Sequence, residues 1–278
     1  MDDHTNEQYF ISCKEYVGYK KELIKNRIAS FRRSPSLYVI QIGNDAASNS
    51  YVRGKEKDCR YVGINFNHIK FENFEDLSEN DLLNIIDEMN NDDNVDGIIV
   101  QLPIPDKYNI KTIQKHISPI KDVDGFRKDS IHNPCTPTGI IDYLKFNNIN
   151  LTGRVCTVIG RSEIVGMPLV NMLISEGATV ISCNSKTPNI KKFTTDCDIV
   201  ISAIGKANYF DVSYFNPNQI LIDVGINRNE NGKLCGDIRD DAKECAILAT
   251  PVPGGVGLLT RLALISNTVS AYLESGNK

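Results

Sequence analysis

Tyr51 and Lys55 stand four residues apart in the segment SNSYVRGK, residues 48–55. If this segment is helical, both side chains project from one face, one turn apart. A phenol can donate or accept a hydrogen bond, and a lysine is a compact charge whose pKa falls readily on burial. Such a pair can move protons or hold a polar substrate. The alternative is a surface helix with a solvated Lys55, because exposed lysines are the rule.

The elements predicted around this pair alternate between strand and helix. Strands are predicted at 37–42, 64–70 and 96–101, and helices at 12–33, around Tyr51 and Lys55 up to Gly63, and at 77–89. This alternation indicates an α/β unit with parallel strands. Ligands collect beyond the carboxyl ends of such strands. The Tyr51 helix and Gln101 both follow a strand, which favours a site over a surface helix.

The second half of the chain has the strand–helix–strand frame of a dinucleotide-binding fold. A strand at 155–159 runs into the turn GRSEIVG, residues 160–166, and a helix to about 176 leads to a strand at 178–183. Ser162 stands where G-x-G-x-x-G has its second glycine, so the glycine pattern alone is a weak signal. Further strands are predicted at 198–204, 219–224 and 246–250, and a final helix at 259–273.

The end of the 178–183 strand bears on the choice of dinucleotide. An NAD site usually has a carboxylate there to bind the ribose 2′-hydroxyl. This chain has Asn184, Ser185, Lys186 and Thr187 instead, and Arg161 lies in the glycine turn. These residues favour a 2′-phosphate, and therefore NADP over NAD.

Composition excludes several other classes of protein. The 278 residues carry a net charge of −4, without the footprint of a nucleic-acid-binding or membrane-surface protein. The polar N-terminus has no signal-peptide pattern, and no apolar run approaches the roughly 18 residues of a membrane span. We therefore expect a cytoplasmic protein. The eight cysteines have no C-x-x-C and the four histidines are isolated, so we expect reduced thiols and no metal.

A long loop at 117–139 contains Asp122 and Asp124. A loop of this length is usually functional or a linker. The two aspartates suit Asx turns, part of a cation loop, or acceptors for N–H groups of a ligand, and turn formation is the simplest of these.

Seven motifs in this order resemble the bifunctional methylenetetrahydrofolate dehydrogenase/methenyltetrahydrofolate cyclohydrolase family over nearly the whole chain. They are SNSYVRGK (48–55), VQLPIP (100–105), KDVDGF (121–126), PCTPTG (134–139), GRSEIVG (160–166), DVGIN (223–227) and TPVPGGVG (250–257). The resemblance implies a folate-binding α/β domain, 1–137 plus 259–278, facing a Rossmann-type NADP-binding domain, 138–258, across a cleft. It also implies a homodimer in one-carbon metabolism.

The activity implied is the oxidation of 5,10-methylenetetrahydrofolate by NADP+, followed by hydrolysis to 10-formyltetrahydrofolate. Lys55 is similar to the family's catalytic lysine and Tyr51 to the tyrosine along the folate ring. Together with Gln101 they would steer proton transfer in the hydrolysis. Asp124 would accept N–H bonds from the amino-pyrimidinone edge of the pterin.

The remaining expected contacts also follow from the resemblance. Val100, Leu102, Pro253, Gly254, Gly255, Val256 and Gly257 would contact the folate. Gly160, Arg161, Ser162, Ser185 and Ile226 would contact NADP, with Arg161 and Ser185 on the 2′-phosphate. Three features depart from the family pattern: Asn184 replaces a histidine, Leu258 replaces a proline, and the N-terminal helix lacks the usual Gly-Lys opening.

Two other interpretations fit parts of the sequence. Tyr51-x-x-x-Lys55 also matches the catalytic pair of short-chain dehydrogenases, but there the pair follows the glycine turn within one domain. Here it precedes Gly160, on a separate α/β unit. A folate- or nucleotide-binding protein without turnover is the second alternative, against which the set Tyr51, Lys55, Gln101 and Asp124 argues.

Overall fold

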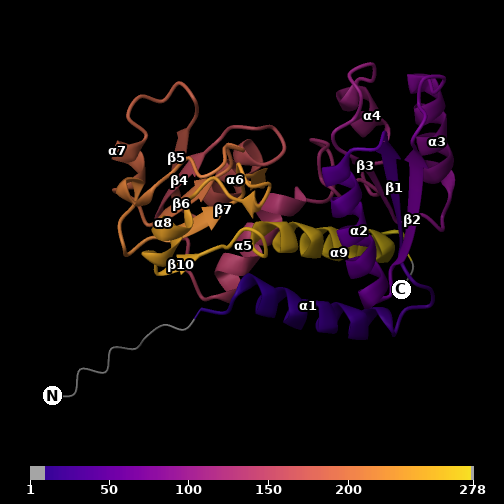
Figure 1. The fold of residues 1–278 in the computed structure, drawn as a ribbon. Coiled ribbons are helices and arrows are strands. Elements are labelled where there is room, and N and C mark those ends of the chain that lie inside the picture. Colours follow the sequence, from indigo (N-terminus) through magenta and orange to yellow (C-terminus); the bar gives the residue numbers. More distant parts are fainter. Residues whose placement is uncertain (1–9, 277–278) are drawn as a thin grey trace. The chain divides into compact units, whose positions relative to one another are not determined.

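The computed structural model describes residues 10–276, and the chain divides into two compact units (Figure 1). The β1–β3 unit comprises Tyr19–Gly139 and the chain from Thr260. The β4–β10 unit comprises Ile140–Leu259 and the chain up to Gly18. The expected domains differ from these units mainly at described residues 10–18, which group with the later unit. There Tyr16 packs against Tyr143, with ring centroids 5.7 Å apart.

Three parallel strands in the order β2-β1-β3 form the sheet of the β1–β3 unit. Its elements are β1 (Ser36–Ile42), α2 (Ala46–Val62), β2 (Asn65–Phe71), α3 (Glu79–Asn91), β3 (Gly97–Gln101) and α4 (Ile110–His116). The α1 (Cys13–Ile28), α5 (Cys135–Phe146) and α9 (Val256–Glu274) helices each contain a point where the chain passes from one unit to the other.

The ends of α2 follow from local sequence. Asp45 is the N-cap, and its carboxylate accepts a 2.7 Å bond from the backbone N–H of Ser48. Gly63 ends the helix at a φ of 93°, a left-handed conformation that glycine adopts without steric cost. The helix that carries Tyr51 and Lys55 is thus fixed at both ends.

Apolar side chains fill both faces of the three-stranded sheet. One cluster joins Leu37 and Val39 of β1 to Val52 of α2, and the other joins Ile40 to Leu82 and Ile86 of α3. The first cluster also contains Ala263, Leu264, Ile265, Val269 and Ala271 of α9.

The α9 helix corrects one expectation from composition. By length and composition alone, its 19 residues could cross a membrane. More than half of the apolar window is buried, however, and its side chains complete the core described above. This pattern is that of a core helix in a globular protein.

The β4–β10 unit has a five-stranded parallel sheet in the order β10-β7-β6-β4-β5 and an antiparallel pair, β8–β9. Its elements are β4 (Val155–Ile159), α6 (Gly166–Ser175), β5 (Thr179–Cys183), α7 (Lys191–Thr194), β6 (Ile199–Ser202), η1 (Val212–Tyr214), β7 (Ile220–Asp223), β8 (Asn227–Arg228), β9 (Leu234–Cys235), α8 (Asp240–Glu244) and β10 (Leu248–Ala249). The chain leaves β4 for β5 on one side and returns to β6 on the other. That reversal is the topological switch point at which doubly wound sheets bind ligands.

Several predicted boundaries are wrong. The first helix ends at Ile28 rather than at residue 33, and α5 begins at Cys135, inside the loop expected at 117–139. Pro137 lies in the first turn of α5, where its missing N–H costs no hydrogen bond. The last helix begins at Val256, within the glycine loop. The elements α4, α7, η1, α8 and the β8–β9 pair were not predicted.

Candidate active site and dinucleotide site

Tyr51 and Lys55 lie on one face of α2, as their spacing predicts. The Lys55 ammonium lies 5.1 Å from the centre of the Tyr51 ring, and Lys55 is only 5% exposed. Burial, and then the negative charge of Asp124, raises the pKa of the Tyr51 phenol. The phenol therefore stays protonated at neutral pH and can donate a hydrogen bond.

Gln101, at the carboxyl end of β3, orients Lys55. Its Oε1 accepts a 3.1 Å bond from Lys55 Nζ, while its Nε2 donates to the carbonyl of Leu102 at 2.7 Å. The Ser48 hydroxyl donates to the same carbonyl at 3.2 Å. The amide is thus held with its oxygen toward the ammonium. Among residues 10–276, Lys55 has no carboxylate partner within ion-pair distance.

A chain of polar side chains around the buried Gln41 joins the first turn of α2 to the sheet. Gln41 on β1, in register with Gln101, is 1% exposed and donates to Asn49 Oδ1 at 2.8 Å. His68 Nε2 donates to Gln41 Oε1 at 3.0 Å, and Asn49 donates to Asn44 Oδ1 at 2.7 Å. Sequence reasoning missed this support, although a glutamine inside the apolar run LYVIQI was a visible signal.

The two aspartates of the KDVDGF segment have different surroundings. Asp122 is buried, and its carboxylate accepts the backbone N–H of Arg127 at 2.9 Å, as a turn-forming residue does. Burial raises the pKa of Asp122. Asp124 is half-buried and close enough to influence both Tyr51 and Cys135 electrostatically. Cys135, which sequence reasoning also missed, is buried there, and burial followed by Asp124 raises the pKa of its thiol.

The glycine turn after β4 packs too closely for side chains at two positions. A Cβ on Gly160 would lie 2.3 Å from the carbonyl oxygen of Ala203, and one on Gly166 would lie 2.2 Å from that of Gly160. Ser162 replaces the second glycine of the usual pattern, and its hydroxyl accepts the N–H groups of Val165 and Gly166, both at 3.3 Å. The glycines of this turn therefore let β4, α6 and the loop after β6 pack backbone against backbone.

Arg161 extends from this turn to the end of β5. Its guanidinium donates to the Ser182 hydroxyl at 3.0 Å and to the Ser182 carbonyl at 2.5 Å. Ser185 is exposed just beyond that strand. Asn184 forms an Asx turn, in which its Oδ1 accepts the N–H of Lys186 at 3.0 Å. A cation and a hydroxyl thus stand at the strand end where NAD sites have a carboxylate.

Ile226 and the loop at 253–257 are neighbours in the β4–β10 unit. A Cβ on Gly257 would lie 3.7 Å from Ile226 Cδ1, and Ile226 is 57% exposed. Gly255 permits a tight turn, because its Cβ would lie 2.3 Å from the carbonyl oxygen of Pro251. The loop therefore packs closely against its own backbone, and the close approach of a ligand to its glycines stays a prediction.

The predicted site residues fall into two groups, one in each unit. The β1–β3 unit holds Tyr51, Lys55, Val100, Gln101, Leu102 and Asp124, and the β4–β10 unit holds Gly160, Arg161, Ser162, Ser185, Ile226 and residues 253–257. Within residues 10–276, no group of three or more His, Cys, Asp or Glu side chains is placed to hold a metal ion. All eight cysteines are free.

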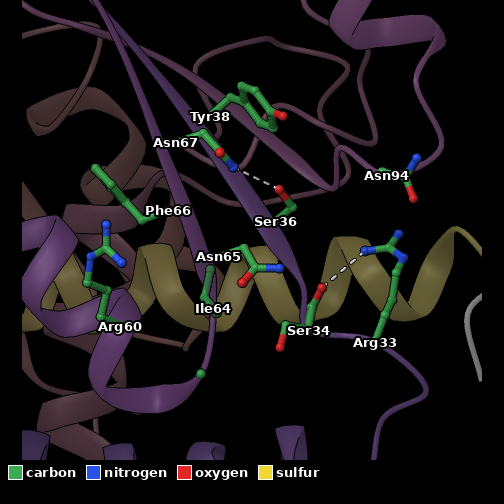
Figure 2. A pocket seen from close by; sticks show the side chains of 11 residues that line it. Arg33, Ser34, Ser36, Tyr38, Arg60, Ile64, Asn65, Phe66, Asn67 and Asn94 are labelled. Atoms are coloured by element: carbon green, nitrogen blue, oxygen red, sulfur yellow. Dashed lines mark hydrogen bonds between the residues drawn. The ribbon is translucent and has the colours of Figure 1, made fainter.

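A hollow of about 610 Å³ lies at the opposite, amino ends of β1 and β2 (Figure 2). Its two arginines already have acidic partners, since Arg33 pairs with Asp96 at 2.6 Å and Arg60 with Glu56 at 2.9 Å. Figure 2 shows these arginines at opposite ends of the hollow. Neither Lys55 nor Gln101 lines this hollow.

These features define a class of protein, an α/β protein of two units. One unit has a parallel sheet with a glycine turn at its switch point, and the other holds a site of lysine, tyrosine and glutamine. Comparisons with known proteins specify the family. The family model described as the tetrahydrofolate dehydrogenase/cyclohydrolase catalytic domain matches residues 11–124. The model of the family's NAD(P)-binding domain matches residues 134–275. The chain belongs to the tetrahydrofolate dehydrogenase/cyclohydrolase family.

Individual relatives agree over nearly the full length. The bifunctional protein FolD of Bacillus subtilis is 44% identical over 274 residues, covering 94% of this chain and 96% of the relative. The crystal structure of the bifunctional FolD dehydrogenase/cyclohydrolase from Campylobacter jejuni has a TM-score of 0.91 at 36% identity, covering 96% and 99% of the two chains. A Trypanosoma brucei FolD structure, described as complexed with NADP cofactor and inhibitor, has a TM-score of 0.88 at 27% identity, covering 97% and 99%.

Proposed function

We propose that the protein oxidises 5,10-methylenetetrahydrofolate to 5,10-methenyltetrahydrofolate with NADP+ and hydrolyses that product to 10-formyltetrahydrofolate. The family supports both activities. The observation that carries the hydrolysis is the buried Lys55 ammonium held on Gln101 Oε1 at 3.1 Å. It offers a directed proton donor beside a phenol at the carboxyl edge of the sheet.

Water adds to the methenyl carbon, a proton leaves that water, and the bond from the carbon to N5 opens so that the formyl group remains on N10. Each step moves a proton, and positioned side chains accelerate such transfers. Lys55 is our candidate for moving these protons, with Gln101 fixing its direction and Tyr51 lying along the folate. Val100 and Leu102 flank Gln101 and would contact the same ligand.

Asp124 is our candidate for the pterin anchor. A carboxylate can accept two N–H bonds from the amino-pyrimidinone edge, and bonds to an ionised acceptor are the stronger kind. The half-buried position of Asp124 beside Tyr51 supports this role, because Asp122 serves the turn instead. Residues 253–257 are proposed to line the folate site with backbone.

The dinucleotide is proposed to bind at the glycine turn of the β4–β10 unit. The glycines at 160 and 166 let β4, α6 and the loop after β6 pack closely, and backbone N–H groups of such a turn, with the start of the following helix, suit a pyrophosphate. Arg161 and Ser185 would bind the 2′-phosphate, while Ser162 and Ile226 would contact the rest of the molecule. When bound, NADP+ supplies the hydride acceptor. The Trypanosoma brucei relative described with NADP supports this choice.

Three further points rest on the resemblance of the motifs. We propose that residues 1–137 with 259–278 bind folate and that 138–258 bind NADP. We also propose a homodimer located in the cytoplasm. The net charge of −4 is in keeping with a small-molecule substrate rather than a nucleic acid.

A dehydrogenase assay with each nicotinamide cofactor tests the proposal. Purified protein supplied with methylenetetrahydrofolate should reduce NADP+ at a higher kcat/KM than NAD+, because Arg161 is a cation at the 2′-position. The methenyl absorbance should then decay as hydrolysis proceeds. Equal or reversed cofactor preference would refute the role of Arg161 and Ser185, and an absence of both reactions would refute the function itself.

A further inference from the structure

A fully buried carboxylate in the β4–β10 unit binds four donors from two separate segments. The Oδ2 of Asp237 accepts the Ser202 hydroxyl and the Ile204 N–H, both at 2.8 Å. Its Oδ1 accepts the Lys206 N–H at 2.8 Å and Asn227 Nδ2 at 3.0 Å. Asp237 is 0% exposed. In the described part of the chain, no cationic side chain lies within ion-pair distance of this carboxylate.

Three of these donors belong to β6 and the loop that follows it, 203–206, and that loop forms one side of the switch point. Ala203 donates its N–H to the carbonyl of Ile159 at 2.8 Å, and its own carbonyl lies where a Cβ of Gly160 would be. The loop is therefore in direct contact with the glycine turn. A shift of this loop relative to the glycine turn would change the shape of the crevice between β4 and β6. Doubly wound folds bind a dinucleotide in that crevice.

A second buried carboxylate fixes the first. Asp223, at the end of β7, accepts the N–H of Asp237 at 2.9 Å and that of Ile238 at 3.0 Å. Its pKa is raised by burial, while Lys243, 2.8 Å away, opposes that shift. Gly225 leaves the room that this arrangement needs, since a Cβ there would lie 2.1 Å from Asp237 Oδ1. The backbone hydrogen bonds to Asp223 and the space beside Gly225 thus fix the position of the Asp237 carboxylate.

We propose that Asp237 is a positioning residue for the dinucleotide, and that it sets the loop at 203–206 against the nicotinamide half. The inference rests on the proposed function. Arg161 and Ser185 assign the 2′-phosphate end to the β5 side of the turn. A dinucleotide crossing the switch point then has its other half on the β6 side, where Asp237 holds the loop.

The substitution Asp237→Asn tests this role with almost no change in volume. The amide NH₂ cannot accept a hydrogen bond, so one pair of donors loses its acceptor and the loop must shift. We expect the KM and the dissociation constant for NADP+ to rise about 10-fold, which corresponds to about 1.4 kcal/mol of binding free energy. Hydrolysis of supplied methenyltetrahydrofolate needs no dinucleotide, and its rate should stay within about twofold.

Asp198→Asn is the matched control. Asp198 is at the amino end of the same sheet, where it accepts the N–H of Val155 at 2.8 Å and pairs with Arg154 at 2.8 Å. Its loss should lower the melting temperature without changing the affinity for NADP+. If Asp237→Asn leaves NADP+ affinity unchanged, or lowers both activities and the melting temperature in parallel, the positioning role is refuted.

A second variant covers the case in which Asp237→Asn does not fold. Ser202→Ala removes one of the four donors and should raise the dissociation constant for NADP+ about two- to fivefold, the value of one hydrogen bond. An unchanged constant would overturn the proposal. Quenching of tyrosine fluorescence measures the affinity for NADP+. This measurement tests the role of Asp237 even if the wild-type protein shows neither folate reaction. Failure of the proposed function is therefore distinguishable from failure of this inference.

Discussion

Lys55 is buried beside a neutral amide instead of a carboxylate. An ion pair in such a position would hold the ammonium through a second charge, whereas the Gln101 oxygen fixes its direction with a hydrogen bond alone. Burying this charge costs free energy. The proposed need for a proton donor at this site explains why the charge is kept there. This arrangement suits the role proposed for Lys55, the transfer of protons during addition of water and opening of the bond to N5.

The substitution Lys55→Met tests that role. Hydrolysis of methenyltetrahydrofolate should fall by at least about 100-fold, the lower range of general acid–base effects, while hydride transfer falls much less. Decay of the methenyl absorbance measures the first activity and formation of NADPH the second. Lys57→Met is the control, since Lys57 is exposed on the same helix. Unchanged hydrolysis in Lys55→Met would remove this lysine from the mechanism.

Local spacing was enough to predict some residues of the site but not their supports. Tyr51 and Lys55 share a helix face, and Gln101 ends a strand, so periodicity and strand order bring them together. Gln41 and Cys135 reach the site from β1 and from the start of α5, and only tertiary packing reveals such contacts.

At the scale of the elements, the turn between β4 and α6 is tightly packed. The two glycines of this turn allow a strand, a helix and the loop after β6 to meet with backbone against backbone. Gly160 also has a φ of 117°, which L side chains rarely adopt. Both constraints act on the same residue, and they can be separated by experiment.

Gly160→Ala should lower the free energy of unfolding by more than about 3 kcal/mol, because backbone strain of about 1–3 kcal/mol adds to the clash with Ala203. Gly153→Ala is the matched control. Gly153 also has a positive φ, 78°, but a Cβ there would meet nothing within 4 Å, so only strain of about 1–2 kcal/mol is expected. Urea unfolding of both variants measures the difference. Equal losses would show that the close approach to Ala203 contributes nothing.

Element length decided which parts of the fold the sequence could predict. Long strands such as β1 and β4, and helices such as α2 and α3, carry enough residues to show a period. The helices α7 and α8, of four and five residues, span little more than one turn, and β8 and β9 have two residues each. Such elements exist because neighbouring parts of the unit hold them, which no local pattern records.

For the molecule as a whole, two histidines link stability to pH. His132 is buried, and burial lowers its pKa, although its bond to the Ile120 carbonyl opposes that shift. Burial, followed by the charge of Lys70, also lowers the pKa of His68. A lowered pKa means that the unfolded chain binds protons more readily. Stability is therefore present above the ordinary histidine pKa and is lost as the pH falls through the lowered values.

We accordingly expect the melting temperature to fall as the pH is lowered from about 7.5 to about 5.5, and His132→Gln to reduce that fall. His116→Gln is the control, because His116 lies against Asp87 at a more exposed position. Differential scanning fluorimetry across this range measures both. The same pH dependence in His132→Gln as in the wild type would show that His132 does not contribute.

The position of α9 in the sequence has a consequence for biosynthesis. The strands and helices that carry Lys55, Gln101 and Asp124 leave the ribosome first, yet one of their two core clusters includes Ala263 to Ala271 of the last helix. The β4–β10 unit draws its chain from residues up to Leu259 and can close earlier. The half of the protein that is synthesised first therefore lacks part of its core until α9 has been synthesised.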